Sequence, residues 1–318
     1  MAIALTGTMF AGCGADAGNE TTSASSTASA EASGGEKIGV VLKSLANPFY
    51  VTMQEAIEAK GDELGVEIIL QAPEQETDTE KQMQIMENMI TQQVDAIILT
   101  PNGSTEMAPA VKKCNDANIP VVVVDTRLDE DAMKESNATT ISFIGSDNYY
   151  GGEIAAEEMK DAIGEGKVAV LEGISGHESS IKRVGGFTDK AEELGGIEIV
   201  ASQPADWDQE KGYTVFQNIL QANPDITGLF AANDMMALGA VKAIEDAGLS
   251  GTITVIGFDA TDDAKESIKA GKMLGSIAQS PEDMGTTALE TALEYIKTGS
   301  CEEDIAVDVY MLSADMID

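Results

Sequence analysis

Short, continuously apolar runs alternate with longer helical stretches along most of this 318-residue chain. The run VVVV at residues 121–124 is the plainest case, and IGVV, AIIL and VIGF repeat the pattern. Strands that are apolar at every position are typical of parallel sheets covered by helices on both faces. Their alternation with helices predicts right-handed βαβ units, and therefore an α/β fold.

The number of strand-like runs favours two parallel sheets over a single sheet of about ten strands. The runs alone do not show where the division between the sheets falls. We expect helices near residues 48–64, 79–93, 104–117 and 286–297, and a terminal strand near 307–312. Asn47 before Pro48 suits a helix N-cap followed by a proline at the first helical position. Glycines in ELG (63–65) and EDAGLSG (245–251) mark helix ends.

Charge and cysteine content exclude several classes of function. Nineteen Lys and Arg against 55 Asp and Glu give a net charge of −36, which repels nucleic acid and anionic lipid headgroups. Apart from Cys13, the cysteines are Cys114 and Cys301, which allow one disulfide arithmetically. Neither lies in a CxxC or a metal-spaced cluster, so no metal or redox cofactor is expected. We expect Cys114 to be a small buried residue on a helix.

The N-terminal segment predicts export and lipid attachment. Its apolar core runs to Phe10 and is too short to span a bilayer, which takes about 20 helical residues. FAGC resembles a bacterial lipobox, so we expect residues 1–13 to be a lipoprotein signal with Cys13 as the lipidated residue. The segment departs from that pattern because no Lys or Arg precedes the apolar core. Residues 14–36 are rich in Ser, Thr, Ala, Gly and Glu and predict a flexible tether.

Aromatic and polar side chains follow the ends of several predicted strands. In open parallel sheets, ligands bind beyond the carboxyl ends of the strands. Aromatic faces with a few aimed carboxylate and amide groups predict a sugar or polyol pocket. Each residue also has a plainer interpretation, since the rings could be core packing and the Asp and Asn side chains could be helix caps or turn residues. The candidates are Ser44, Asn47, Phe49, Tyr50, Asp125, Trp207, Asn233 and Asp259, with Arg183 from IKRVGGF.

Longer motifs carry a family resemblance that spans Lys37 to Leu312. LANPFY, GSDNYYGG, ASQPADWDQEKG, FAANDMMALGAVKAI, VIGFDAT and SIAQSPEDMG resemble the ribose-binding type of sugar-binding proteins that feed ABC importers. The resemblance implies the type I periplasmic-binding-protein fold, in which two Rossmann-like lobes with parallel sheets are joined by a three-strand hinge and close on a monosaccharide. It implies an N-terminal lobe of residues 37–145 plus 280–308 and a C-terminal lobe of residues 146–279 plus 309–318.

The resemblance also implies ligand-binding residues. Phe49, Tyr50 and Trp207 would sandwich the sugar ring. The groups that would bond its hydroxyls are Asn47, Asp125, Arg183, Asn233, Asp259 and Gln279, with Ser44 nearby. One departure puts ribose itself in doubt: the family has Asp-Arg after the fourth strand, whereas this chain has Asp125-Thr126, with Arg127 one step later in VVVVDTRLDEDAM.

In extended backbone a shift of one residue points a side chain to the opposite face, so we expect the bidentate contact to be lost or replaced at Thr126. The loop after it is expected to be longer and acidic, and His177, the only histidine, is expected to be a loop or rim residue near the pocket mouth. Another pentose, a hexose or a polyol remains open as the ligand.

The resemblance implies an extracytoplasmic solute-binding protein, lipid-anchored at the outer face of the cell membrane or periplasmic, which works as a monomer with ABC importer permease subunits. One alternative is a sensor that presents a sugar or a furanosyl signal to a membrane receptor or kinase. A repressor effector domain predicts a basic N-terminal helix-turn-helix, which the lipid-type signal replaces here. An enzyme is disfavoured because GISG lacks the GxSxG spacing, GEGKV lacks the Walker spacing, and no GxGxxG opens a helix after the first strand.

Overall fold

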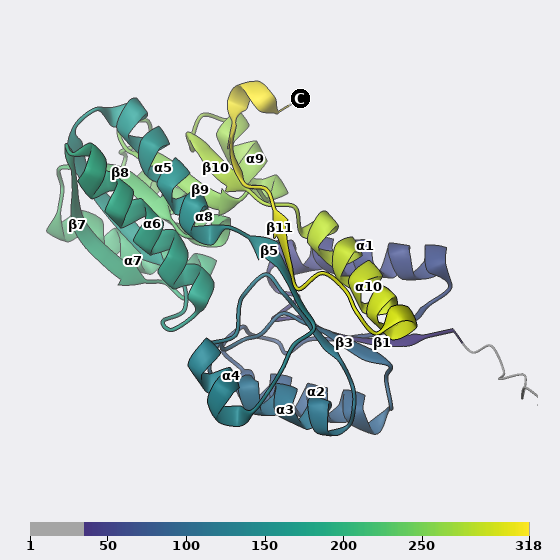
Figure 1. The fold of residues 1–318 in the computed structure, drawn as a ribbon. Helices are drawn as coiled ribbons and strands as arrows, with labels where there is room; N and C mark the ends of the chain where they lie inside the picture. The colour runs from purple at the N-terminus through teal and green to yellow at the C-terminus, as the bar shows by residue number, and fades with distance from the viewer. Residues whose placement is uncertain (1–34, 318) are drawn as a thin grey trace, which may run out of the picture. The chain divides into compact units, whose positions relative to one another are not determined.

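The computed structural model describes residues 35–317, which form two six-stranded sheets covered by helices (Figure 1). The predicted α/β fold with two lobes is confirmed. The predicted signal segment, Cys13 and residues 14–34 of the predicted tether lie outside the described residues.

The first sheet has the strand order β11-β5-β4-β3-β1-β2, and all its neighbouring strands are parallel. Its two faces carry separate apolar cores, one under α1 and α10 and the other under α2 and α3. The strands are β1 (Lys37–Val41), β2 (Glu67–Gln71), β3 (Ala96–Leu99), β4 (Val121–Val124), β5 (Ser142–Ser146) and β11 (Asp304–Val307), and the helices are α1 (Pro48–Leu64), α2 (Thr79–Thr91), α3 (Ala108–Asp116), α4 (Glu130–Ser136) and α10 (Pro281–Thr298).

The second sheet has the order β12-β10-β9-β8-β6-β7, and only the pair of β10 and β12 is antiparallel. Helices α5 and α6 cover one face, and α7, α8 and α9 cover the other. The strands are β6 (Gly166–Glu172), β7 (Ile197–Pro204), β8 (Ile226–Ala231), β9 (Thr254–Asp259), β10 (Gly275–Ala278) and β12 (Tyr310–Ser313), and the helices are α5 (Asn148–Ile163), α6 (Glu178–Leu194), α7 (Gln209–Ala222), α8 (Asp234–Asp246), α9 (Asp262–Lys269) and the short 3-10 helix η1 (Ala314–Met316).

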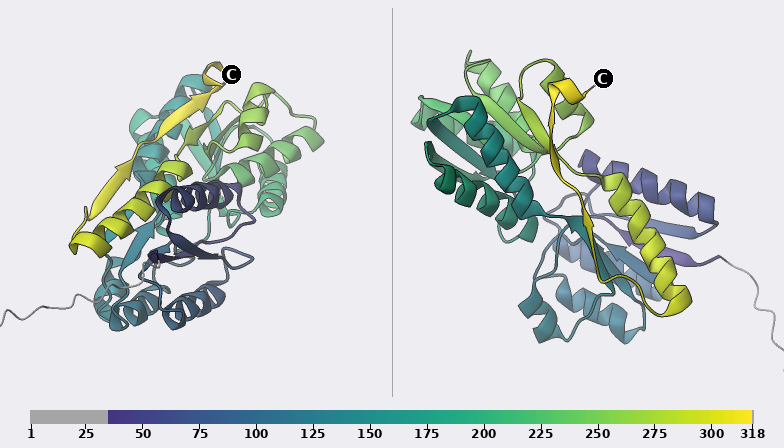
Figure 2. Two further views of the ribbon diagram at one scale, coloured as in Figure 1. Left: turned by 90° about the vertical axis from the view of Figure 1, so that its right-hand side faces the viewer. Right: turned by 45° about the horizontal axis from the view of Figure 1, so that its top comes forward.

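The chain passes from one sheet to the other at three places: between β5 and α5, between β10 and α10, and between β11 and β12. The last passage corrects a prediction, because the expected single strand at 307–312 is two strands. β11 pairs parallel with β5, whereas β12 pairs antiparallel with β10. One extended segment therefore serves both sheets, and the yellow end of the ribbon in Figures 1 and 2 follows this path.

Local signals set the helix boundaries. Asn47 caps α1 by accepting a hydrogen bond from the backbone N–H of Phe49, and Pro48 occupies the first helical position, as predicted. Gly65 ends α1 with φ of 72°, a left-handed conformation that favours glycine. The acidic segment after β4, expected to be a loop, contains α4, whose N-cap Asp129 accepts from the backbone N–H of Ala132. Cys114 is fully buried on α3, as expected.

Candidate functional site

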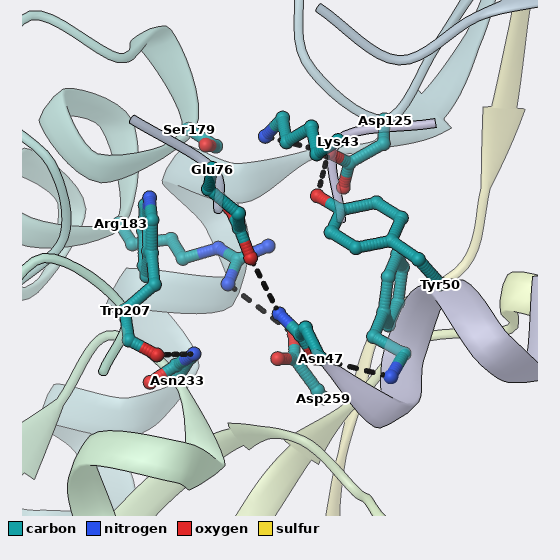
Figure 3. A pocket seen from close by; sticks show the side chains of 11 residues that line it. Lys43, Asn47, Tyr50, Glu76, Asp125, Ser179, Arg183, Trp207, Asn233 and Asp259 are labelled. Atoms are coloured by element: carbon teal, nitrogen blue, oxygen red, sulfur yellow. Dashed lines mark hydrogen bonds and ion pairs between the residues drawn. The ribbon is translucent and has the colours of Figure 1, made fainter. Parts of the chain in front are cut away.

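A small cavity lies where strand ends of both sheets meet. We call this space the inner cavity. Figure 3 shows its side chains pointing inward from the two sheets. The residues that line the inner cavity are Lys43, Asn47, Phe49, Tyr50, Glu76, Asp125, Ser179, Arg183, Trp207, Asn233 and Asp259.

The structure brings most of the predicted site residues together around this cavity. Three follow β1 and lie at the start of α1, and the others come from the ends of β4, β8 and β9, from α6 and from the segment between β7 and α7. The predicted residues that line the inner cavity are Asn47, Phe49, Tyr50, Asp125, Arg183, Trp207, Asn233 and Asp259.

Three predicted residues lie just outside the inner cavity. Ser44 donates from Oγ to the backbone oxygen of Glu74 at 2.8 Å and lines a second cavity, which we call the outer cavity. Thr126 is fully buried behind Asp125. Gln279 donates from Nε2 to Oδ1 of Asp259 at 2.7 Å, and so touches the site through that carboxylate.

The prediction missed three residues that line the inner cavity: Lys43, Glu76 and Ser179. Lys43 lies two residues beyond the end of β1, so the rule that ligands bind at strand ends could have found it. Glu76 lies in the polar segment PEQET between β2 and α2, which carries no distinguishing pattern. Ser179 is in the first turn of α6, two residues after His177.

One polar cluster is centred on Asp125, which lies just beyond β4 with φ of 67°. Its Oδ2 accepts from Lys43 Nζ at 3.1 Å, from the Tyr50 hydroxyl at 3.0 Å and from Thr126 Oγ1 at 2.8 Å. Burial alone would raise the pKa of Asp125, but the charges of Lys43 and Arg183 outweigh it and the pKa is lowered. Burial, with the neighbouring Asp125, raises the pKa of Tyr50 well above its usual value. Asp125 is therefore ionised and Tyr50 remains a donor.

A second cluster is centred on Arg183 of α6. Its Nε donates to Oδ1 of Asn148 at 2.7 Å, and its NH1 donates to the backbone oxygen of Ala232 at 2.8 Å and to Oδ1 of Asp259 at 3.3 Å. The guanidinium also lies 3.8 Å from the centroid of the Phe258 ring. Burial raises the pKa of Asp259 to about 8, even though Arg183 acts in the opposite direction. These contacts fix the orientation of Arg183 at the floor of the cavity.

The aromatic residues are held by contacts of different kinds. Phe49 and Tyr50 meet edge to face, with centroids 5.2 Å apart. Trp207 packs against Gly173, where any side chain would clash with the indole ring. The Trp207 Nε1 donates to Nδ1 of His177 at 3.3 Å. The geometry thus presents three rings to one cavity, while their stacking on a sugar stays a prediction.

His177 differs from the expectation of a rim residue. It immediately precedes α6, yet it is only 4% exposed. Burial, reinforced by the charge of Lys43, lowers the pKa of His177 to about 3, so the imidazole is neutral and can accept from Trp207. The histidine supports the tryptophan from behind.

The departure from the family pattern at Thr126 and Arg127 has a clear structural outcome. Thr126 faces inward and accepts from Lys43 Nζ at 2.7 Å. Arg127 points away from the cavity, pairs with both oxygens of Asp304 at 2.9 Å, and lies over the ring of Phe143. The cation beside Asp125 is therefore Lys43, from the segment after β1, and not a residue of the segment after β4.

Comparisons with known proteins agree with this geometry. Residues 38–300 match the family described as "Periplasmic binding protein domain". The chain belongs to this family. A ribose import binding protein from Bacillus subtilis is 38% identical over 85% of this chain and 84% of its own length. The D-allose-binding periplasmic protein of Escherichia coli is 35% identical over 82% of this chain and 84% of its own.

A solved structure extends the family comparison to the fold. The periplasmic solute-binding protein from Actinobacillus succinogenes with bound D-allose superposes with a TM-score of 0.84 at 39% identity, covering 88% of this chain and 98% of that one.

Among residues 35–317, no helix combines the length and the apolar composition needed to cross a membrane. In the same range, no group of three or more His, Cys, Asp or Glu side chains is arranged to hold a metal ion.

Proposed function

We propose that this periplasmic binding protein captures a monosaccharide and delivers it to an ABC importer. The observation that carries the proposal is the inner cavity, where the pairs Lys43–Asp125 and Arg183–Asp259 and three aromatic rings from both lobes face one small space. Carboxylate, amide and guanidinium groups in that number match the hydroxyls of a sugar, and aromatic faces match its C–H surfaces. The names of the relatives, which bind ribose or D-allose, support the same class of ligand.

The proposed mechanism is hinge closure. Residues 37–145 plus 280–308 would form one lobe and residues 146–279 plus 309–318 the other, which agrees with the strand membership of the two sheets. A sugar that contacts both lobes binds the closed state more tightly than the open state and shifts the population toward it. The closed form would be the one that the permease subunits recognise.

The residues have distinct proposed roles. Asp125, Arg183, Asn233, Asp259 and Asn47 would bond sugar hydroxyls, while Phe49, Tyr50 and Trp207 would cover the ring faces. Ser44, Thr126 and Gln279 would act through their neighbours. Lys43 would supply the positive charge that the family pattern takes from an arginine after the fourth strand. An ammonium is a compact donor without the planar fork of a guanidinium, so this exchange changes which hydroxyl arrangement fits best.

We also propose that Cys13 carries a lipid that anchors a monomer outside the cytoplasm, with residues 14–36 as the tether. The family supports an extracytoplasmic location, and the FAGC motif supports the anchor. No catalytic role is proposed for the site, since the relatives are named as binding proteins.

A thermal-shift screen, followed by calorimetry, tests the proposal. We expect D-ribose, D-allose or a related pentose, hexose or inositol to raise the melting temperature, because a ligand of the native state stabilises it. The sugar should be recovered unchanged after incubation. Arg183→Ala should cost at least ~2 kcal/mol of affinity, because it removes a charged donor that would bond a sugar hydroxyl. Arg127→Ala, which removes an arginine outside the cavity, is the matched control and should bind like the wild type.

Two results would contradict the proposal. The first is a screen in which no sugar or polyol raises the melting temperature of the wild-type protein. The second is equal affinity of the Arg183→Ala and Arg127→Ala variants for a sugar that does bind, which would place the binding site elsewhere.

A further inference from the structure

One acidic side chain of the inner cavity has no ion-pair partner among residues 35–317. Five Lys, Arg, Asp and Glu side chains line this cavity, and four of them lie within ion-pair distance of each other as Lys43–Asp125 and Arg183–Asp259. The fifth is Glu76, and among residues 35–317 no Lys, Arg or His nitrogen lies within ion-pair distance of it. Its one side-chain contact is with a neutral group, since Oε1 accepts from Asn47 Nδ2 at 2.9 Å.

Glu76 occupies a boundary position. The residues shared by the inner and outer cavities are Asn47, Glu76 and Trp207. Beyond them the outer cavity is lined by polar side chains of both sheets, including Gln75, Asp206 and Lys211. A ligand in the inner cavity would therefore turn one end toward Glu76, and Figure 3 shows this carboxylate pointing into the space between Arg183 and Asn47.

This half-buried carboxylate can accept more hydrogen bonds than residues 35–317 donate to it. Burial raises the pKa of Glu76 by more than the charge of Lys43 lowers it. The surrounding positive charge therefore stabilises this carboxylate only in part. An ionised carboxylate has about four acceptor positions, and Asn47 fills one of them. Hydroxyl groups of a bound sugar are the donors that a neutral ligand brings, and a charged acceptor makes the stronger kind of hydrogen bond.

We propose that Glu76 is a specificity-determining residue that accepts a hydrogen bond from a sugar hydroxyl at the end of the ligand facing the outer cavity. The proposal rests on the proposed function, because it assumes that a sugar fills the inner cavity. It adds that one hydroxyl of that sugar is recognised by a carboxylate from the segment between β2 and α2, outside the set of residues that the strand-end rule and the family motifs identify.

The competing explanation is that Glu76 only positions Asn47. Both explanations predict weaker binding when Glu76 is removed, so a single variant does not separate them. They differ in whether the loss depends on one particular hydroxyl. A cycle that combines a protein variant with a ligand lacking one hydroxyl measures this coupling directly.

The experiment uses calorimetry with D-ribose, D-allose and their single-deoxy analogues. The proteins are the full chain, Glu76→Ala, Glu76→Gln and the control Glu74→Ala, which changes a neighbouring acid that lines only the outer cavity. We expect Glu76→Ala to weaken binding of the parent sugar roughly ten- to a hundredfold, as for a charged hydrogen bond. Glu76→Gln, which keeps an acceptor and its contact with Asn47, should lose less, and Glu74→Ala should change little.

The decisive result is the pattern across the analogues. One deoxy sugar should bind the wild type as weakly as the parent sugar binds Glu76→Ala, and should lose little more on that variant. Every other deoxy sugar should bind Glu76→Ala more weakly than it binds the wild type by the same factor as the parent sugar. An equal loss for all analogues would overturn the proposal and favour the positioning role. If the wild type binds none of the sugars, the proposed function fails together with the inference. This outcome differs from an equal loss for all analogues, in which the wild type does bind sugar.

Discussion

Asp259 shows how burial changes the chemistry of a single residue. Its pKa is raised from 3.8 to about 8, first by burial. Between these two values the folded, ligand-free protein holds a proton that the unfolded chain has released. The stability from this group is therefore fully present below about pH 4 and is lost as the pH rises through 8. Arg183 and Gln279 hold the same carboxyl group in place for a ligand.

The first prediction concerns this residue. Asp259→Asn should make the ligand-free protein less sensitive to alkaline pH, because a neutral amide has no proton to release. The difference in unfolding free energy between variant and wild type should shift in favour of the variant by on the order of a few kcal/mol between pH 5 and pH 9. Urea denaturation at several pH values measures it. Parallel profiles for the two proteins would mean that Asp259 is ionised throughout the range.

Single residues also show what the sequence could predict about the site. Asp125, Asn233 and Asp259 follow apolar strands directly, so their positions come from the strand pattern and the edge rule. Lys43 also follows a strand, but from sequence alone a lysine at this position is expected to be exposed to solvent. The structure shows that it is buried beside Asp125. Glu76 depends on how the segment between β2 and α2 folds back, which no periodicity determines.

At the scale of secondary-structure elements, the start of α1 links the fold to the site. Asn47 caps the helix through Oδ1 and contacts Glu76 through Nδ2, so one amide serves both purposes. Pro48 fixes the first turn, and the next two residues are the rings of Phe49 and Tyr50. The helix start therefore positions the rings, since any change in its direction would move both of them relative to Asp125.

The prediction at this scale compares two helix caps. Asn47→Ala should lower the unfolding free energy by about 1 kcal/mol, as for other lost caps, and should also weaken sugar binding by at least tenfold because the contact with Glu76 is lost. Asp129→Ala removes the cap of α4, away from the inner cavity, and should affect stability without affecting affinity. Urea denaturation and calorimetry on both variants test this. Equal sugar affinity of the two variants would show that Asn47 caps α1 without contributing to sugar binding.

Element boundaries were predictable where a local signal exists. Asn47–Pro48 and Gly65 mark both ends of α1, and the continuous apolar run of β4 marks a strand buried on both faces. Helix α4 was missed because its residues are mostly charged and show no apolar periodicity, although Asp129 is a good N-cap. The division of the final strand was missed because the choice between the two sheets is made by pairing with β5 and β10, which are distant in sequence.

At the scale of the whole described chain, contacts between the two sheets' segments hold this arrangement without using the inner cavity's ion pairs. The backbone N–H of Glu178, at the start of α6, donates to Oγ of Ser104, which lies between β3 and α3, at 3.2 Å. Thr126 Oγ1 lies 3.3 Å from Ser179 Oγ. Both contacts join the first turn of α6 to the first sheet's loops, so they exist only while the two lobes lie together.

These contacts should contribute to affinity through the closed state. A ligand that requires closure binds with an apparent affinity reduced by the fraction of molecules able to close. Ser104→Ala removes one hydrogen bond, worth about 0.5–1.5 kcal/mol, and should weaken sugar binding roughly two- to tenfold although Ser104 does not line the inner cavity. Ser202→Ala, whose hydroxyl bonds Glu172 within the second sheet, is the matched control. The change in Trp207 fluorescence at saturating sugar should be the same in both variants, because the final closed state is unchanged. Wild-type affinity in Ser104→Ala would show that this contact does not bias the lobes toward closure.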